Sequence, residues 1–255
     1  MKLCRFADKK SNMLFGIVEN KIIIEIEGTP FNSFTIKDKK HNLDEVKLLA
    51  PCVPSKIVAI GLNYKDHAAE MNKKIPDDPM LFLKPSSSVI AHEDNIIYPS
   101  HMSSRVDFEG ELAVVISKEA KHIKPSSALD YVLGYTCIND VTARDLQAKD
   151  GQFTRAKGFD TFAPLGPWIE TRLSPFDLEI KTFLNGDLKQ HSNTSNLIFP
   201  IPKLISFISN VMTLYPGDII STGTPSGIAP MKPGDRVEVE IQGIGILRNY
   251  IITQD

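Results

Sequence analysis

Residues 107–116 read Asp107-Phe108-Glu109-Gly110-Glu111-Leu112-Ala113-Val114-Val115-Ile116. The run is rich in β-branched and aromatic residues and has polar residues at its start, so it predicts a strand. Side chains alternate between the two faces of a strand, so Glu109 and Glu111 are expected to point the same way. Gly110 between them allows another group to approach closely. The pattern therefore predicts two carboxylates held side by side.

A second predicted strand supplies a third acidic residue. Residues 131–139 are rich in β-branched and aromatic residues, and Asp140 follows them directly. Adjacent carboxylates repel one another, and a shared proton or a hard cation with oxygen ligands relieves the repulsion. Glu109, Glu111 and Asp140 are therefore a candidate site for Mg²⁺ or Mn²⁺, with Ca²⁺ as a further candidate. The alternative for the Glu-x-Glu pair alone is a strand with one solvated acidic face.

Composition limits the class of protein. The 255 residues are 42% hydrophobic and 24% charged, as in an ordinary soluble globular protein. The net charge of -2 lacks the basic excess of a nucleic-acid binder. Charges in the first ten residues and the lack of an apolar run of membrane length predict a cytoplasmic protein with no membrane partner. The three cysteines show no CxxC spacing and are expected to be buried, reduced thiols.

The chain is expected to form two parts, a small β-rich N-terminal domain over residues 1–52 and a catalytic domain over residues 53–255, divided near Pro51 and Pro54. Many predicted strands, few helices and no alternation of strand and helix favour an α+β, β-dominated fold over a doubly wound sheet. The predicted strands and turns are Leu3–Ala7, Met13–Val18, Lys21–Ile26, Lys56–Gly61, a hairpin at Leu184–Asp187, and strands 219–222 and 236–241 after two Pro-Gly-Asp turns. The predicted helices are Asn42–Leu49, a short one over Asn63–Met71, Val141–Lys149 capped by Asp140 or Thr142, and one from Pro202 at its first position to Val211.

Several other side chains carry candidate chemistry. His67 and Glu70 lie three residues apart on the short helix, so they form either a general base for water or an ordinary surface pair. Lys157 is either a stabiliser of an enolate beside the metal or a solvated loop lysine. The turn from Thr222 to Gly227, with Gly223 and Thr224, offers hydroxyl and N–H groups to a carboxylate, and Gln147 is a further candidate contact. Lys84 and Arg144 are charges near these segments, and structural salt bridges explain them equally well.

Two common catalytic motifs are missing. The sequence has no Gly-x-Ser-x-Gly elbow and no Gly-x-Gly-x-x-Gly loop, which speaks against a serine hydrolase and a dinucleotide enzyme. The chemistry is therefore expected to depend on the metal.

Seven motifs in register resemble those of the fumarylacetoacetate hydrolase family. They are Gly61-Leu-Asn63-Tyr64-Lys-Asp-His67-Ala-Ala-Glu70, Phe82-Leu-Lys84-Pro85, Asp107-Phe-Glu109-Gly-Glu111-Leu, Asn139-Asp140-Val-Thr-Ala-Arg144-Asp145-Leu-Gln147, Lys157-Gly-Phe-Asp, Leu184-Asn-Gly186 and Thr222-Gly223-Thr224-Pro225. The resemblance spans roughly residues 50–252. The first fifty residues resemble those of longer bacterial members labelled hydroxyheptadienedioate isomerases or hydratases.

The resemblance implies a mixed β-sandwich roll, a metal on Glu109, Glu111 and Asp140, and a homodimer. It also implies a His67–Glu70 dyad on a lid over residues 64–79, Lys157 beside the metal, and a small 2-oxo acid as substrate. The candidate substrate contacts are Asn63, Tyr64, Gln147, Gly223 and Thr224.

Three functions are compatible with these residues. The leading expectation is a Mg²⁺- or Mn²⁺-dependent hydrolase that cleaves a C–C bond in a 2,4-dioxo acid of the acylpyruvate or fumarylpyruvate kind. The alternative is an isomerase, tautomerase or decarboxylase of compounds such as oxaloacetate or 2-hydroxyhepta-2,4-diene-1,7-dioate, which needs no attacking water. A third reading, a metal-stabilised binding protein without catalysis, leaves the His67–Glu70 pair without a purpose.

Overall fold

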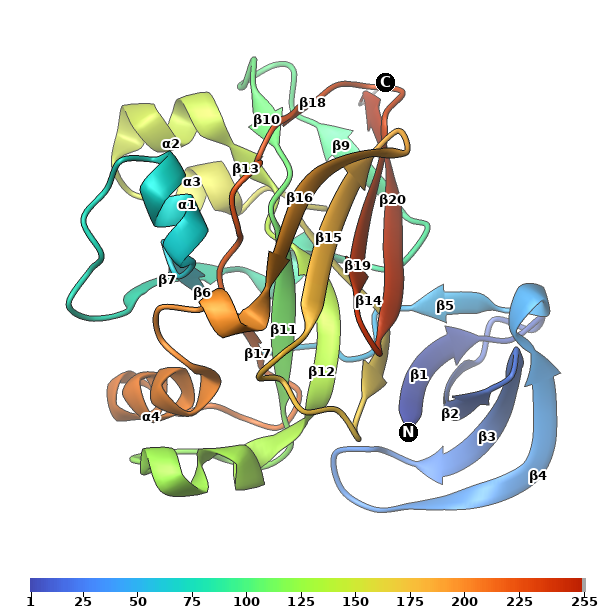
Figure 1. The fold of residues 1–255 in the computed structure, drawn as a ribbon. Coiled ribbons are helices and arrows are strands. Elements are labelled where there is room, and N and C mark those ends of the chain that lie inside the picture. Colours follow the sequence, from blue (N-terminus) through green and yellow to red (C-terminus); the bar gives the residue numbers. More distant parts are fainter. Residues whose placement is uncertain (254–255) are drawn as a thin grey trace.

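The longest sheet runs through the whole molecule (Figure 1). The computed structural model describes residues 1–253, in which strands take 44% and helices 17% of the chain. The sheet has the strand order β4-β3-β2-β1-β14-β12-β11-β17-β6-β7, with β5 on β1 and β8 on β14. Its strands are β1 (Lys2–Ala7), β2 (Met13–Glu19), β3 (Ile22–Gly28), β4 (Phe34–Asn42), β5 (Lys47–Leu49), β6 (Ile57–Gly61), β7 (Met80–Lys84), β8 (Val89–Ile90), β11 (Gly110–Ile116), β12 (Val132–Asn139), β14 (Ala163–Glu170) and β17 (Ile219–Ser221).

A five-stranded and a three-stranded sheet complete the β structure, in the orders β16-β15-β19-β20-β9 and β13-β10-β18. Their strands are β9 (Asn95–Tyr98), β10 (Val106–Asp107), β13 (Thr142–Ala143), β15 (Glu179–Leu184), β16 (Asp187–Asn193), β18 (Pro230–Met231), β19 (Arg236–Ile241) and β20 (Gly245–Thr253). The largest apolar cluster joins Leu112 and Val114 of β11 to Ile180 of β15 and Val239 of β19, so the core lies between the two larger sheets. The expected β-dominated α+β fold is confirmed.

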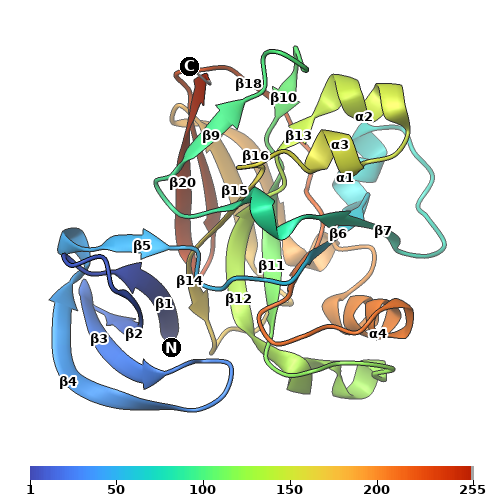
Figure 2. The ribbon, with the colours of Figure 1, turned by 180° about the vertical axis from the view of Figure 1, so that it is seen from behind.

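Few helices accompany the sheets. They are α1 (Lys65–Glu70), α2 (Arg144–Asp150), α3 (Thr154–Lys157) and α4 (Ile201–Val211), with short 3₁₀ turns at Leu43–Glu45, Ser86–Ser88, Pro125–Tyr131 and Thr194–Asn196. Figures 1 and 2 show α1, α2 and α3 gathered at one side of the sheets and α4 separate from them. Helix α4 buries Ile201, Leu204, Ile205 and Ile208, the spacing of one apolar helical face. No helix in residues 1–253 is long and apolar enough to span a membrane.

The sheet passes without a break across the expected domain boundary. Strand β1 pairs with β14, in the register Lys2 to Glu170 and Leu3 to Ile169. Leu3, Ile17 and Ile26 share one buried cluster with residues of the remaining chain such as Ile138 and Ile169. The N-terminal strands therefore cover one end of the large sheet, and the division at residue 52 stays a prediction.

The local turn chemistry agrees with the sequence. The hairpin between β15 and β16 pairs Leu184 with Asp187, and Asn185 and Gly186 have φ values of 55° and 91°. Two positive φ values in a two-residue loop are the signature of a type I′ turn, which Asn-Gly tolerates. The three cysteines are buried as free thiols, and burial raises the pKa of Cys4 to about 12.

Three predictions about helices were wrong. Residues 42–49 form a 3₁₀ turn and strand β5, because Leu48 pairs with Phe6 of β1 and packs on the apolar cluster around it. Strand β4 before them was not predicted. Helix α2 starts at Arg144 instead of Val141, because Thr142 and Ala143 pair with β10. No described side chain caps it. Pro202 is the second residue of α4, after Ile201.

We expect Glu25 of β3 to make stability depend on acidic pH. Burial opposes its ionisation, but hydrogen bonds from Lys39, His41 and Lys37 outweigh burial and lower its pKa to about 2. A lowered carboxyl pKa stabilises the fold above the unfolded pKa of about 4.5, and this contribution is lost as pH falls towards 2. Both lysines are partly exposed, so solvent weakens these ion pairs. Glu25→Gln should therefore lower the unfolding free energy by only about 1–2 kcal/mol at pH 7.

Denaturant unfolding of Glu25→Gln and the wild type between pH 3 and 7 measures this effect. The difference in unfolding free energy should shrink as pH falls. Glu27→Gln, on the exposed continuation of the same strand with an ion pair of 3.8 Å, serves as the control and should follow the wild type. A difference that is constant with pH would contradict the assignment.

Candidate active site

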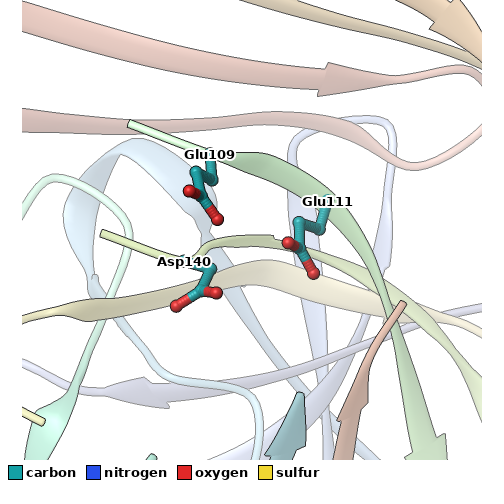
Figure 3. Close-up of side chains that lie close together, drawn as sticks. All are labelled: Glu109, Glu111 and Asp140. Carbon is teal, nitrogen blue, oxygen red and sulfur yellow. The ribbon is translucent and has the colours of Figure 1, made fainter. Parts of the chain in front are cut away.

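Three buried carboxylates face one another where β11 begins and β12 ends (Figure 3). One oxygen each from Glu109, Glu111 and Asp140 lies within 4.8 Å of the others. The predicted single strand over 107–116 is interrupted at Phe108–Glu109, between β10 and β11. Here the backbone N–H of Glu109 donates to the Asn139 side chain (2.9 Å), and that of Asp140 donates to the Glu109 carbonyl (2.8 Å). These bonds place the ends of the two strands side by side.

Gly110 allows the close approach that the sequence suggested. A Cβ atom at this position would lie 2.1 Å from Oγ1 of Thr182, which no side chain could tolerate. Its N–H donates to Oε1 of Gln190 at 3.0 Å. The five-stranded sheet therefore supports Glu109 and Glu111 from behind.

Glu111 is held in place by neutral donors. Its Oε2 accepts hydrogen bonds from Oγ of Ser221 (2.5 Å) and from the N–H of Gly223 (2.8 Å). Burial, with the nearby charges of Asp140 and Glu109, raises the pKa of Glu111 to about 8. A carboxylate with this environment is stabilised by a proton or a cation, so Glu111 suits a metal ligand.

Lys157 and Lys84 form ion pairs with the other two carboxylates, Glu109 and Asp140. Nζ of Lys157 lies 2.7 Å from Glu109 and 2.6 Å from Asp140, and Nζ of Lys84 lies 2.6 Å from Asp140. Burial lowers the pKa of Lys84. The same burial acts on Lys157, but Asp140 and Glu109 outweigh it and its pKa is raised. Both lysines are therefore structural partners of the site and neither is a solvated loop residue.

Arg144 completes the charge network. Its guanidinium pairs with Glu109, with Asp107 at 2.9 Å and with the side-chain oxygen of Gln147 at 2.5 Å. Burial opposes the ionisation of Glu109, but Lys157 and Arg144 outweigh it and lower its pKa to about 2. Gln147 is thereby fixed at the edge of the site.

The charges of the site balance when Glu111 is ionised. Four carboxylates and four cations form one network: Asp107, Glu109, Glu111 and Asp140 with Lys84, Arg105, Arg144 and Lys157. A divalent ion would leave two positive charges in excess once Glu111 is ionised. The three-carboxylate set, buried and made only of oxygen donors, fits Mg²⁺ or Mn²⁺.

His67 and Glu70 form the expected pair on α1. Nδ1 of His67 lies 3.0 Å from Oε2 of Glu70, and Oε1 of Glu70 accepts the N–H of Gly227 at 3.0 Å. A carboxylate only accepts hydrogen bonds, so in the neutral imidazole Nδ1 carries the proton and Nε2 has a lone pair. The pair thus has the arrangement of a general base.

One cavity of about 330 Å³ contains most of the candidate residues. Its wall includes all three carboxylates and four further predicted residues: His67, Gln147, Lys157 and Thr224. Glu70 lies behind His67. The remaining wall is largely apolar and consists of Ile60, Gly61, Leu62, Met71, Met80, Phe82, Ala148 and Phe153, with Lys73 and Arg144 as further cations.

Comparison with known proteins identifies the family. A family model described as "Fumarylacetoacetate (FAA) hydrolase C-terminal" matches residues 56–252. The chain belongs to this hydrolase family. A second model, "Rv2993c-like, N-terminal", matches residues 1–51. The chain is therefore an enzyme of the fumarylacetoacetate hydrolase family, as its motifs predicted.

Members of the family with different reaction names resemble this chain. The oxaloacetate tautomerase YisK of Bacillus subtilis is 44% identical, over 83% of this chain and 75% of its own length. The structure of 2-hydroxyhepta-2,4-diene-1,7-dioate isomerase from Mycobacterium marinum is 42% identical, with a TM-score of 0.93, and covers 100% of this chain and 99% of that one. Maleylpyruvate hydrolase from Sphingobium, solved with manganese(II) and pyruvate, is 30% identical with a TM-score of 0.85 and full coverage of both chains.

The predicted substrate contacts Asn63, Tyr64 and Gly223 lie outside the cavity wall of this family member. Asn63 is fully buried and bonds to the N–H of Phe199 (2.8 Å) and the carbonyl of Thr222 (2.7 Å), so it fixes two loops. Tyr64 is buried in the main core, and its hydroxyl has no hydrogen-bond partner within residues 1–253. Gly223 does not line the cavity, but its N–H donates a hydrogen bond to Glu111. The structure thus places these residues behind the site.

Sequence reasoning missed some residues that build the site. Ser221 bonds to Glu111, and Asn139 fixes the backbone of Glu109. Ser221 stands directly before the motif that begins at Thr222, and Asn139 is the first residue of the motif that contains Asp140, but neither was assigned a role. The apolar wall side chains Phe82 and Phe153 contact edge to face, although seventy residues separate them in the sequence. Their ring centroids lie 5.3 Å apart. No local pattern in the sequence reveals such a contact.

Proposed function

We propose that this enzyme interconverts the keto and enol forms of a 2-oxo dicarboxylic acid of the oxaloacetate type, with Mg²⁺ or Mn²⁺ as cofactor. The observation that carries the proposal is the presence of His67, with its Nε2 lone pair, in the same cavity wall as the carboxylate triad and Lys157. Proton transfer next to a carbonyl needs one base and a positive site for the enolate oxygen. The likeness to an oxaloacetate tautomerase at 44% identity supports the same reaction.

The charge balance supports a substrate with two negative charges. With Glu111 ionised, the four carboxylates and four cations around the triad sum to zero before the charge of a divalent ion is counted. Such an ion brings two positive charges, and a dicarboxylate neutralises them inside a cavity whose low dielectric constant makes uncompensated charge costly.

The residues of the chain divide the reaction between them. Glu109, Glu111 and Asp140 would hold the divalent ion, which would act as a Lewis acid on the 2-oxo group. Nε2 of His67 takes a proton from the carbon next to this group, and Glu70 stabilises the resulting imidazolium. Lys157 has a third N–H beyond those that bond to Glu109 and Asp140, and it stabilises the negative charge on the enolate oxygen. The proton held by His67 then passes to that oxygen, which completes the enol and restores the neutral imidazole.

Hydrolysis of a C–C bond is the second candidate. Glu70 is anchored by both His67 and the N–H of Gly227, an arrangement that also orients a base for an attacking water. Water would add to the 4-oxo carbon of a 2,4-dioxo acid, and the bond between carbons 3 and 4 would break to release a pyruvate enolate and a carboxylic acid. Decarboxylation of oxaloacetate and isomerisation of 2-hydroxyhepta-2,4-diene-1,7-dioate use the same kind of enolate without that water.

Parallel assays separate these reactions. We expect the enzyme to accelerate the decay of enol-oxaloacetate with Mg²⁺ or Mn²⁺ and to lose the acceleration after verified metal removal with EDTA. His67→Ala should lower the rate at least about a hundredfold, the lower end of general-base contributions. Exposed His101→Ala serves as the control and should keep the wild-type rate. Full activity without metal would refute the proposal, and faster cleavage of an acylpyruvate would favour hydrolysis instead.

A further inference from the structure

Lys73 is the cation of the cavity wall that the charge network does not use. The wall contains three basic side chains besides His67, namely Lys73, Arg144 and Lys157. Arg144 and Lys157 pair with the carboxylates of the site. The ammonium group of Lys73 makes no ion pair or hydrogen bond with any of residues 1–253, and the residue is exposed. Its positive charge is therefore available to a ligand.

The backbone holds Lys73 at the mouth of the cavity. Its N–H donates to the carbonyl of Ala68 at 3.0 Å, which ties residue 73 to α1, the helix that carries His67. The chain then continues to Met80 at the start of β7, and Met71, Lys73 and Met80 all line the cavity. A backbone hydrogen bond thus ties Lys73 to the helix that carries the general base.

The cavity wall that Lys73 shares is largely apolar outside the charge network. The part of the wall that does not belong to the charge network consists largely of Met71, Met80, Phe82 and Phe153. An uncharged acyl group would be accommodated by these side chains alone. A cation beside an apolar wall adds recognition of a negative group at the far end of the ligand, because a charge-assisted hydrogen bond strengthens as water is excluded.

We propose that Lys73 binds the distal carboxylate of a 2-oxo dicarboxylic acid and so makes the site prefer dicarboxylic over monocarboxylic 2-oxo acids. Lys73 is a specificity residue in this scheme, because it pairs with none of the carboxylates of the site and takes no part in proton transfer. The inference rests on the proposed function in one respect, that a 2-oxo acid occupies this cavity.

A matched pair of ligands tests the inference by binding. Oxaloacetate and 2-oxobutanoate have four carbons each and differ in the distal carboxylate. With Mn²⁺ present, equilibrium titration should show that Lys73→Met weakens the binding of freshly prepared oxaloacetate about tenfold, a modest effect for a charge-assisted bond because Lys73 is exposed. Binding of 2-oxobutanoate should not change, and Lys73→Arg should retain most of the preference.

The neighbouring lysine supplies the control. Lys74 is also exposed but is not part of the cavity wall, so Lys74→Met changes the net charge equally and should bind both acids like the wild type. Equal weakening of both acids in Lys73→Met, or the same loss in Lys74→Met, would overturn the inference. If the wild type binds with the expected preference but turns over neither acid, the proposed function fails and the inference on Lys73 stands.

Discussion

Replacing Glu111 by glutamine is expected to lower the affinity for Mn²⁺ at least about a hundredfold while the protein stays folded. Loss of groups that only support a ligand already costs 10- to 100-fold in metal affinity, and Glu111 is itself a proposed ligand. The amide oxygen of glutamine can still accept the hydrogen bonds of Ser221 and Gly223. The substitution also removes a carboxyl group whose ionised form burial disfavours, since the pKa of Glu111 is raised to about 8. The unfolding free energy without metal should therefore be unchanged or higher.

Calorimetric titration with Mn²⁺ and denaturant unfolding in EDTA measure the two halves of this prediction. Glu119→Gln, which changes an exposed carboxylate of the same part of the chain, is the matched control and should bind Mn²⁺ like the wild type. Wild-type affinity in a folded Glu111→Gln protein would exclude Glu111 as a ligand. Unfolding of the variant in EDTA would show instead that the ionised carboxylate stabilises the fold.

Replacing Lys157 by methionine is expected to destabilise the metal-free protein by about 3–5 kcal/mol, the usual loss when one member of a buried ion pair is removed. Lys157 contacts Glu109 and Asp140 and is almost fully buried, so its removal leaves two carboxylates short of a partner. The methionine side chain is similar to that of lysine in length and shape. The loss of stability therefore reflects the missing charge more than a missing volume. A divalent ion would compensate part of that charge and should stabilise the variant more than the wild type.

Urea unfolding in EDTA and in excess Mn²⁺ tests this prediction. Lys149→Met, in the exposed last turn of α2, is the control and should cost little in either condition. A loss of less than about 1 kcal/mol for Lys157→Met in EDTA would mean that the two carboxylates find other partners or protons. An equal gain from Mn²⁺ in the variant and in the wild type would contradict charge compensation.

The strands that carry the triad were predictable because their signals are local. The apolar runs after Gly110 and before Asp140 and the Asn185-Gly186 turn each contain the residues that their conformation requires. Strand β4 was missed because it is charged and largely exposed, with Lys37, Lys39 and Lys40 in its middle. Its partner is β3, and the pairing of β5 with β1 also joins distant segments. Such pairings override the helical spacing that residues 42–49 show in isolation.

The candidate site was predictable as a set of residue types and not as a network. The triad and His67 lie in one cavity wall, as the sequence suggested. The alternatives left open for Lys84 and Arg144 could be decided only by the fold, which brings Lys84 to Asp140 across 56 positions and Arg144 to Glu109 across 35. Asn63 and Tyr64 belong to the motif of His67 but lie outside the cavity wall. The backbone at Tyr64 is extended and its side chain packs in the main core, while Asn63 bonds to two loops.

The first fifty residues cover an apolar cluster that β1 shares with the rest of the chain. Leu3, Ile17 and Ile26 cover apolar side chains of the larger part of the chain, among them Ile169 and Ile219. A shortened chain that begins near Pro54 would expose this face to water and leave the Ile169–Glu170 end of β14 without its partner strand. Bare apolar faces and open strand edges attract other chains. The N-terminal strands cover this face and pair with this end of β14, so we expect the shortened chain to aggregate.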